Sequence, residues 1–137
     1  MTKVHDTLTD LQLGTPLWFA LSARLLALGI LSQFLSAGTS LFIAWEWQMH
    51  KIIGGALFLP IMVLLAGVFA VPRLRGFNWW AGLVCVLYVV QFSLAAGASS
   101  LALAFHPFNG ALLAMASLIL LVKVERRLTK SKDIERT

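Results

Sequence analysis

The stretch that decides the fold is residues 50–71, HKIIGGALFLPIMVLLAGVFAV, which carries no charged side chain after Lys51. As an α-helix it is long enough to cross about 30 Å of hydrocarbon, at roughly 1.5 Å per residue. Three other runs share its character, namely residues 23–42, 77–99 and 107–122. Leu, Ala, Gly and Val dominate all four, and none shows the alternation of apolar and polar residues that a membrane barrel strand requires. The sequence therefore predicts an all-α integral membrane protein, a bundle of four transmembrane helices.

The composition of the chain indicates the same environment. Hydrophobic residues make up 59% of the 137 residues and charged residues only 12%. One small water-soluble core cannot bury so much apolar surface, so the lipid bilayer is the expected solvent. We therefore divide the chain into a cytoplasmic or interfacial N-terminal segment (1–22), a transmembrane domain (23–122) and a basic cytoplasmic tail (123–137).

The positions of Lys and Arg predict how the chain is oriented. The link between the second and third runs carries Arg73 and Arg75, and residues 123–137 are strongly basic. The two other links, 39–49 and 100–105, contain neither Lys nor Arg. Because positive residues near the ends of spans stay in the cytoplasm, both termini are expected there. The net charge of +5 follows from this topology and from contact with anionic headgroups, and no nucleic-acid partner is expected.

The two halves of the chain repeat one order of residues. In each half a Gln-Phe pair lies in the first run, a link follows, and a His-x-x-x-Gly sequence opens the next run. The residues in this order are Gln33, His50 and Gly54 in the first half, and Gln91, His106 and Gly110 in the second. The repeat predicts a bundle built from two pseudo-repeated helix pairs.

The paired histidines favour a haem site. His50 and His106 both open helices that run from the outer to the inner side, so we expect them at one depth, facing each other. A glycine four residues later lies on the same helix face, where it leaves room for a flat macrocycle. The pattern favours haem b between the second and fourth helices, with both histidines as axial metal ligands. The alternative is that the histidines are wetted or helix-capping residues and that the glycines serve close helix packing.

Three more polar residues belong to the candidate site. Gln33 and Gln91 either contact a cofactor or a quinone, or they hydrogen-bond across the bundle and fix helix pairing. Glu46 lies one turn before His50, and it either orients the imidazole or remains a solvated loop charge.

In these residues the chain resembles one four-helix half of the haem A synthase family. That family has histidines on the second and fourth helices, and an acidic residue typically precedes a histidine by one turn, as Glu46 precedes His50. The chain is also similar to uncharacterised bacterial four-helix membrane proteins with paired His-x-x-x-Gly openings, so we expect a bacterial inner membrane. Haem A synthase joins two such halves and this chain has one. The resemblance therefore implies haem-b binding by His50 and His106, but not the synthase reaction.

Three functions agree with the sequence. The first is a small bis-histidine haem-b protein that serves electron transfer or acts as an accessory subunit of a larger membrane redox or photosynthetic complex. The second is a haem-free structural or assembly subunit that packs against a larger membrane complex. The third is a quinone-linked membrane oxidoreductase. Soluble-enzyme chemistry is excluded, because the chain has no Walker loop, zinc-ligand spacing, nucleophile elbow or dinucleotide fingerprint.

Overall fold

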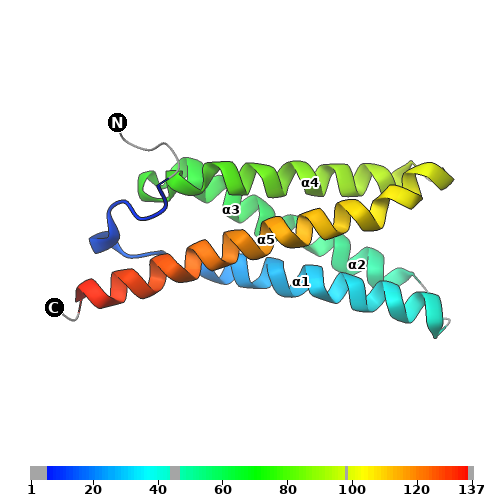
Figure 1. Cartoon of the computed structure of the whole chain (residues 1–137), viewed down its shortest axis with the longest axis horizontal. Helices are drawn as coiled ribbons and strands as arrows, with labels where there is room; N and C mark the ends of the chain where they lie inside the picture. Colours follow the sequence, from blue (N-terminus) through cyan, green and yellow to red (C-terminus); the bar gives the residue numbers. More distant parts are fainter. Residues whose placement is uncertain (1–5, 44–46, 98, 136–137) are drawn as a thin grey trace.

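Four helical units run antiparallel and form one bundle (Figure 1). The computed structural model describes residues 6–43, 47–97 and 99–135. A short 3-10 segment, η1 (Leu11–Leu13), precedes the first unit, α1 (Leu17–Phe42), and the second unit is split into α2 (Gln48–Ala56) and α3 (Phe58–Ala70). A 3-10 turn, η2 (Pro72–Phe77), leads into the third unit, α4 (Asn78–Ala96), and the fourth is the long helix α5 (Ser100–Glu135).

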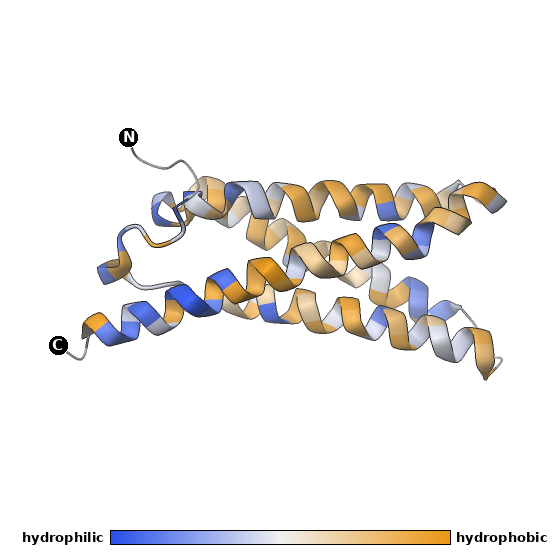
Figure 2. Ribbon diagram, viewed as in Figure 1, coloured by the Kyte–Doolittle hydropathy of each residue, from blue (hydrophilic) through white to orange (hydrophobic). Residues whose placement is uncertain are grey.

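The two ends of the bundle differ in character. At one end η1, η2 and the C-terminal part of α5 lie together, and we call this the basic end (Figure 1). At the other, which we call the far end, α1 and α4 finish and α2 and α5 begin. Figure 2 shows apolar residues along every unit and a hydrophilic stretch in the C-terminal part of α5. The bundle is therefore apolar along its length and charged where α5 extends past it.

Apolar side chains fill the inside of the bundle and also cover its outside. Each unit packs against its neighbours in the chain, and α5 packs against α1 to close the ring. On the outside, Leu35, Phe42 and Leu101 are 71%, 87% and 69% exposed. Each of the four units is long and apolar enough to cross a membrane. An apolar exterior on all units requires lipid as the solvent, so the chain is a multi-pass membrane protein with the predicted four-helix fold.

The second unit breaks where its proline removes a hydrogen bond. Pro60 has no N–H to offer the carbonyl of Ala56, and α2 ends at Ala56. Leu57 lies between α2 and α3 and is buried, 6% exposed. Its side chain fills the space in front of Gly29 of α1, where a Cβ would overlap it. The second unit is therefore broken about one turn before its proline.

The first and fourth helices begin earlier than the apolar runs predicted. The first helix begins at Leu17 instead of residue 23, directly after Pro16. The fourth begins at Ser100 instead of Pro107, so the prediction of a link over residues 100–105 is wrong. The Ser99 hydroxyl accepts a hydrogen bond from the N–H of Ala102 (3.1 Å) and caps this earlier start. Pro107 therefore lies inside a helix, which membrane helices tolerate when neighbours satisfy the freed backbone groups.

At the basic end, Arg127 of α5 fastens the residues that precede α1. Its guanidinium is fully buried and donates hydrogen bonds to the backbone carbonyls of Thr7 (2.8 Å), Thr9 (2.6 Å) and Asp10 (3.2 Å). The carbonyls of Thr7 and Thr9 belong to no helix and receive their donor from this guanidinium, while the carbonyl of Asp10 also accepts from the N–H of Leu13 (3.1 Å). The N-terminal segment, from Asp6 onward, is therefore part of the folded bundle.

Replacing Gly76 with Ala tests this packing. A Cβ at Gly76 of η2 would overlap the backbone of Asp6, which has no flexible end to move away. We expect Gly76→Ala to lower the free energy of unfolding in detergent by about 1–3 kcal/mol, the usual range for overpacking. Gly82→Ala is the matched control, because a Cβ there has open space around it. Equal thermal melting curves for Gly76→Ala and the wild type would contradict the close packing of the N-terminal segment on η2.

Candidate functional site

A layer of polar side chains crosses the bundle toward its far end, and all four helical units contribute to it. We call this set the polar layer; its members are Gln33 and Ser36 of α1, His50 of α2, Tyr88 and Gln91 of α4, and His106 and Asn109 of α5. Hydrocarbon supplies no hydrogen-bond partners, so these side chains bond to one another and to nearby carbonyls. The layer thus contains both histidines and both glutamines that the sequence singled out.

The two predicted histidines lie side by side in this layer. The ring centroids of His50 and His106 are 6.2 Å apart, and the ring planes are tilted by 59°. Trp47 packs edge-on against His50 at 5.5 Å between centroids. Both imidazoles are partly buried. The expectation that the repeat brings these two rings to one depth is confirmed.

Ser36 determines which ring nitrogen of His50 carries the proton. The Ser36 hydroxyl donates its one hydrogen to the carbonyl of Gln33 (3.0 Å). Its oxygen therefore accepts a hydrogen bond from Nδ1 of His50, which lies 3.0 Å away. With the proton on Nδ1, the neutral imidazole keeps a lone pair on Nε2. This is the form in which a histidine binds a metal through Nε2.

Gln91 determines the proton position on His106. Oε1 of Gln91 accepts a hydrogen bond from Nδ2 of Asn109 (2.7 Å), so the other end of the amide is its NH₂ group. That group donates to Nε2 of His106 at 2.9 Å. His106 therefore also carries its proton on Nδ1, and this buried nitrogen has no partner among the described residues. An unpaired buried donor costs about 1–3 kcal/mol of stability.

Gly54 and Gly110 each face a glutamine side chain, and only at Gly110 would a Cβ be tightly placed. A Cβ at Gly54 would lie 3.5 Å from Oε1 of Gln33, and a Cβ at Gly110 would lie 3.3 Å from Nε2 of Gln91. Nε2 of Gln33 also donates to the backbone carbonyl of His50 (3.0 Å). Each half of the chain therefore repeats one contact, in which the glutamine lies across a glycine and reaches the histidine one turn earlier. Of the two alternatives for the glutamines, hydrogen bonding across the bundle is present.

Three residues of the layer were missed by sequence analysis, namely Ser36, Tyr88 and Asn109. Each is a polar residue three positions from a predicted glutamine or histidine in the same helix, and therefore on the same face. That spacing was the signal available in the sequence. Asn109 is the most buried of the three, 6% exposed, and it also donates to the carbonyl of Leu87 (2.9 Å). Glu46, the remaining predicted residue, lies outside the described residues, and its role stays a prediction.

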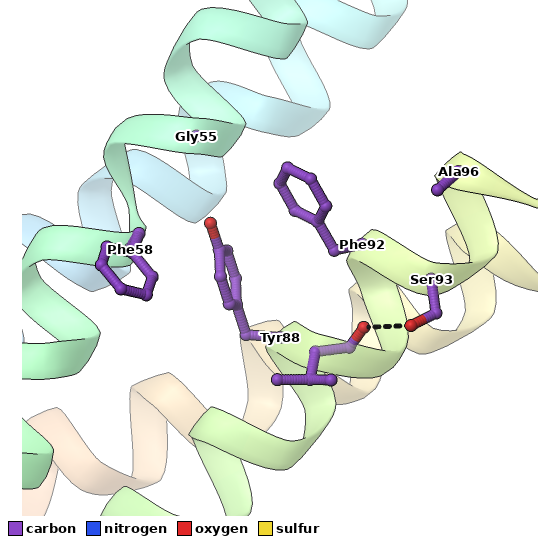
Figure 3. A pocket seen from close by; sticks show the side chains of 7 residues that line it. Gly55, Phe58, Tyr88, Phe92, Ser93 and Ala96 are labelled. Atoms are coloured by element: carbon purple, nitrogen blue, oxygen red, sulfur yellow. Dashed lines mark hydrogen bonds between the residues drawn. The ribbon is translucent and has the colours of Figure 1, made fainter.

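A groove of about 570 Å³ lies next to the polar layer, on the surface between the second unit and α4. Its lining is almost wholly apolar and consists of Gly55, Phe58, Tyr88, Val89, Phe92, Ser93 and Ala96. Figure 3 shows the Tyr88 ring between Phe58 and Phe92. The Tyr88 hydroxyl donates to the carbonyl of Gly54 (2.9 Å), and the Ser93 hydroxyl donates to that of Val89 (2.9 Å). Both hydroxyl hydrogens in the groove are therefore already used.

Comparison with known proteins gives one match. Residues 33–99 match a family model described as a family of unknown function (DUF6220). The matched part includes Gln33, His50, Gly54 and Gln91, and it ends before His106. No curated protein matches the chain, and no solved structure matches it. The resemblance to haem A synthase is tested by none of these comparisons and stays a prediction.

Chemically, the layer offers two neutral imidazoles and no charged side chain among its seven members. Neutral imidazole is a ligand for iron, copper and zinc. No group of three or more His, Cys, Asp or Glu that could hold a bare metal ion occurs in the described parts of the chain. A metal that brings most of its own ligands needs only one or two protein donors, and haem iron is such a metal. Two facing imidazoles therefore suit a metallated macrocycle better than a free ion.

Replacing Asn109 tests the connection between the layer and the stability of the bundle. In Asn109→Leu, Oε1 of Gln91 loses its donor, and the Gln91 amide no longer holds one fixed orientation. We expect a loss of about 1–2 kcal/mol in the free energy of unfolding in mixed micelles, followed by circular dichroism. Ser32→Ala is the control, because Ser32 bonds only to a carbonyl of its own helix. A loss no larger than that of the control would show that the layer is not held together as described.

Proposed function

We propose that this chain is a small haem-b membrane protein in which His50 and His106 are the two axial ligands of the iron. The observation that carries the proposal is the pair of imidazoles 6.2 Å apart, each with its proton on Nδ1. Imidazole nitrogens lie about 2 Å from the metal they bind, so two rings on opposite sides of one ion have centroids roughly 6 Å apart. The spacing and the donor type both fit a bis-histidine iron.

The protonation pattern supports the same assignment. Nε2 of His50 has a lone pair and makes no hydrogen bond among the described residues. The lone pair on Nε2 of His106 accepts a hydrogen bond from the Gln91 amide, so this amide orients the ring and would have to move away for the same lone pair to bind iron. Ser36 accepts a hydrogen bond from Nδ1 of His50 and so fixes the position of its proton. Asn109 donates to Oε1 of Gln91 and so fixes the orientation of that amide. We assign to these residues the role of orienting the ligands.

The proposed activity is electron transfer, because a haem held by two histidines would supply one-electron redox chemistry. The chain's own residues orient the two imidazoles. Gly110 leaves space for the Gln91 amide, since a Cβ there would lie 3.3 Å from its Nε2, and we propose a supporting role for Gly110 and, by the repeat, for Gly54. The protein would serve alone as an electron carrier or as the accessory subunit of a larger redox or photosynthetic complex.

The proposed location is the cytoplasmic membrane of a bacterium, with both termini in the cytoplasm. Arg73 and Arg75 of η2 lie at the same end of the bundle as the basic part of α5. Because Lys and Arg near the ends of spans stay in the cytoplasm, this end is the inner one in our proposal. The polar layer then lies in the outer half of the membrane.

A haem-free structural subunit is the second candidate. It is favoured by the hydrogen bonds from Gln33 to the carbonyl of His50 and from Asn109 to Gln91 and the carbonyl of Leu87, which join helices without any ligand. For a quinone-linked oxidoreductase we find less support. Quinone carbonyls need hydrogen-bond donors, and both hydroxyls of the groove next to the layer already donate to backbone carbonyls.

Haem content separates these candidates. We expect the detergent-purified protein to show a Soret band that sharpens on reduction with dithionite, with about one haem b per chain by pyridine haemochrome. His50→Ala and His106→Ala should each lower the bound haem at least about tenfold, since each removes one of two axial ligands. His5→Ala, which changes the third histidine of the chain, is the control and should retain haem.

Two results would contradict the haem proposal. A stable wild-type protein that is colourless and does not take up added haemin would favour the structural subunit. Full haem content in both His50→Ala and His106→Ala would remove the ligand assignment, whatever the wild type binds.

A further inference from the structure

A second, smaller groove lies along α5 toward the basic end. It has a volume of about 340 Å³ and is lined by Leu118, Ile119, Val122, Lys123 and Arg126. The first three residues make one part of the groove apolar, and the last two make the following part cationic. Such a surface matches a molecule that is apolar at one end and anionic at the other.

The level of this groove along the membrane normal follows from the length of α5. About 20 helical residues cross the hydrocarbon, so a span that begins at Ser100 reaches the headgroups near residue 120. The ion pair between Arg24 of α1 and Glu125 of α5 marks the same level, with 2.7 Å between Nε and Oε1. Lys123 and Arg126 therefore lie where hydrocarbon gives way to headgroups, and the apolar part of the groove faces acyl chains.

The two cations of the groove are not neutralised by the protein. The salt bridge between Arg24 and Glu125 is the one present in the described part of the chain, and it includes neither Lys123 nor Arg126. Lys123 Nζ lies over the ring of Trp80 of α4, 5.6 Å from its centroid. Trp80 thus holds the ammonium group beside α4, and tryptophan at this level is typical of the membrane interface. The groove combines a positioned positive charge with an adjacent apolar channel.

We propose that this groove binds an anionic phospholipid, with the headgroup phosphate at Lys123 and Arg126 and an acyl chain along Leu118, Ile119 and Val122. Charge complementarity selects an anionic headgroup over a zwitterionic one. The site is separate from the polar layer, which lies toward the opposite end of the bundle. The proposal therefore stands whether or not the chain binds haem.

Native mass spectrometry of the full chain in detergent tests the site. The probes are phosphatidylglycerol and phosphatidylcholine with the same acyl chains, added at matched concentrations. We expect phosphatidylglycerol to bind more tightly to the wild type. The double variant K123Q/R126Q should lose about tenfold or more of this preference, because one Lys or Arg near a membrane surface contributes roughly fivefold.

The matched control is K130Q/K132Q, which removes two positive charges from exposed positions farther along α5, outside the groove. The control should keep the preference, and the conservative variant K123R/R126K should keep most of it. Equal binding of the two lipids by the wild type would overturn the proposal. So would an equal loss in K123Q/R126Q and K130Q/K132Q, because it would show attraction to the basic part of α5 as a whole.

Discussion

Hydrocarbon offers no hydrogen bonds, so polar side chains inside the four spans have to satisfy one another. In the polar layer two sets of hydrogen bonds, one in each half of the chain, meet this requirement for all but the buried Nδ1 of His106, which has no partner among the described residues. Asn109 fixes Gln91, which donates to His106, while Gln33 donates to the carbonyl of His50 and Ser36 accepts from its ring. Because the partners of each histidine come from a different helical unit, the same contacts that orient the imidazoles also set how the helices pair. Site and fold therefore depend on the same hydrogen bonds.

The repeat in the sequence explains why the layer could be anticipated. Helices of fixed rise bring residues at matching distances from their ends to one depth, so the repeat predicted that His50 and His106 would meet. It predicted that the two glycines would face a macrocycle, whereas in the structure they face Gln33 and Gln91. It could not predict these contacts. Gly54 faces Gln33, and Gly110 faces Gln91, because the amides fold across the bundle, and side-chain rotamers of this kind depend on neighbours from other helices.

The helix ends, too, were predicted only in part. The apolar runs predicted four spans but placed the start of the fourth at Pro107, because a proline is most common in the first turn of a helix. The helix starts at Ser100 instead, where Ser99 provides a cap, and the proline lies in its interior. At the basic end, hydropathy gave no indication that Arg127 would be buried. Its three backbone acceptors lie more than one hundred positions earlier in the chain, a pairing that only the closed bundle creates.

The central claim is which nitrogen of each imidazole carries the proton, since a ligand role for both histidines depends on an Nε2 that carries none. Nitrogen-15 NMR of the ligand-free protein, labelled at the histidine rings, measures them directly, with the signals assigned through His50→Ala and His106→Ala. We predict that the neutral form of His50 and that of His106 both carry a proton on Nδ1 and none on Nε2. A proton on Nε2 of either neutral ring would contradict the network described above and, with it, the pairing of these histidines as ligands of one iron.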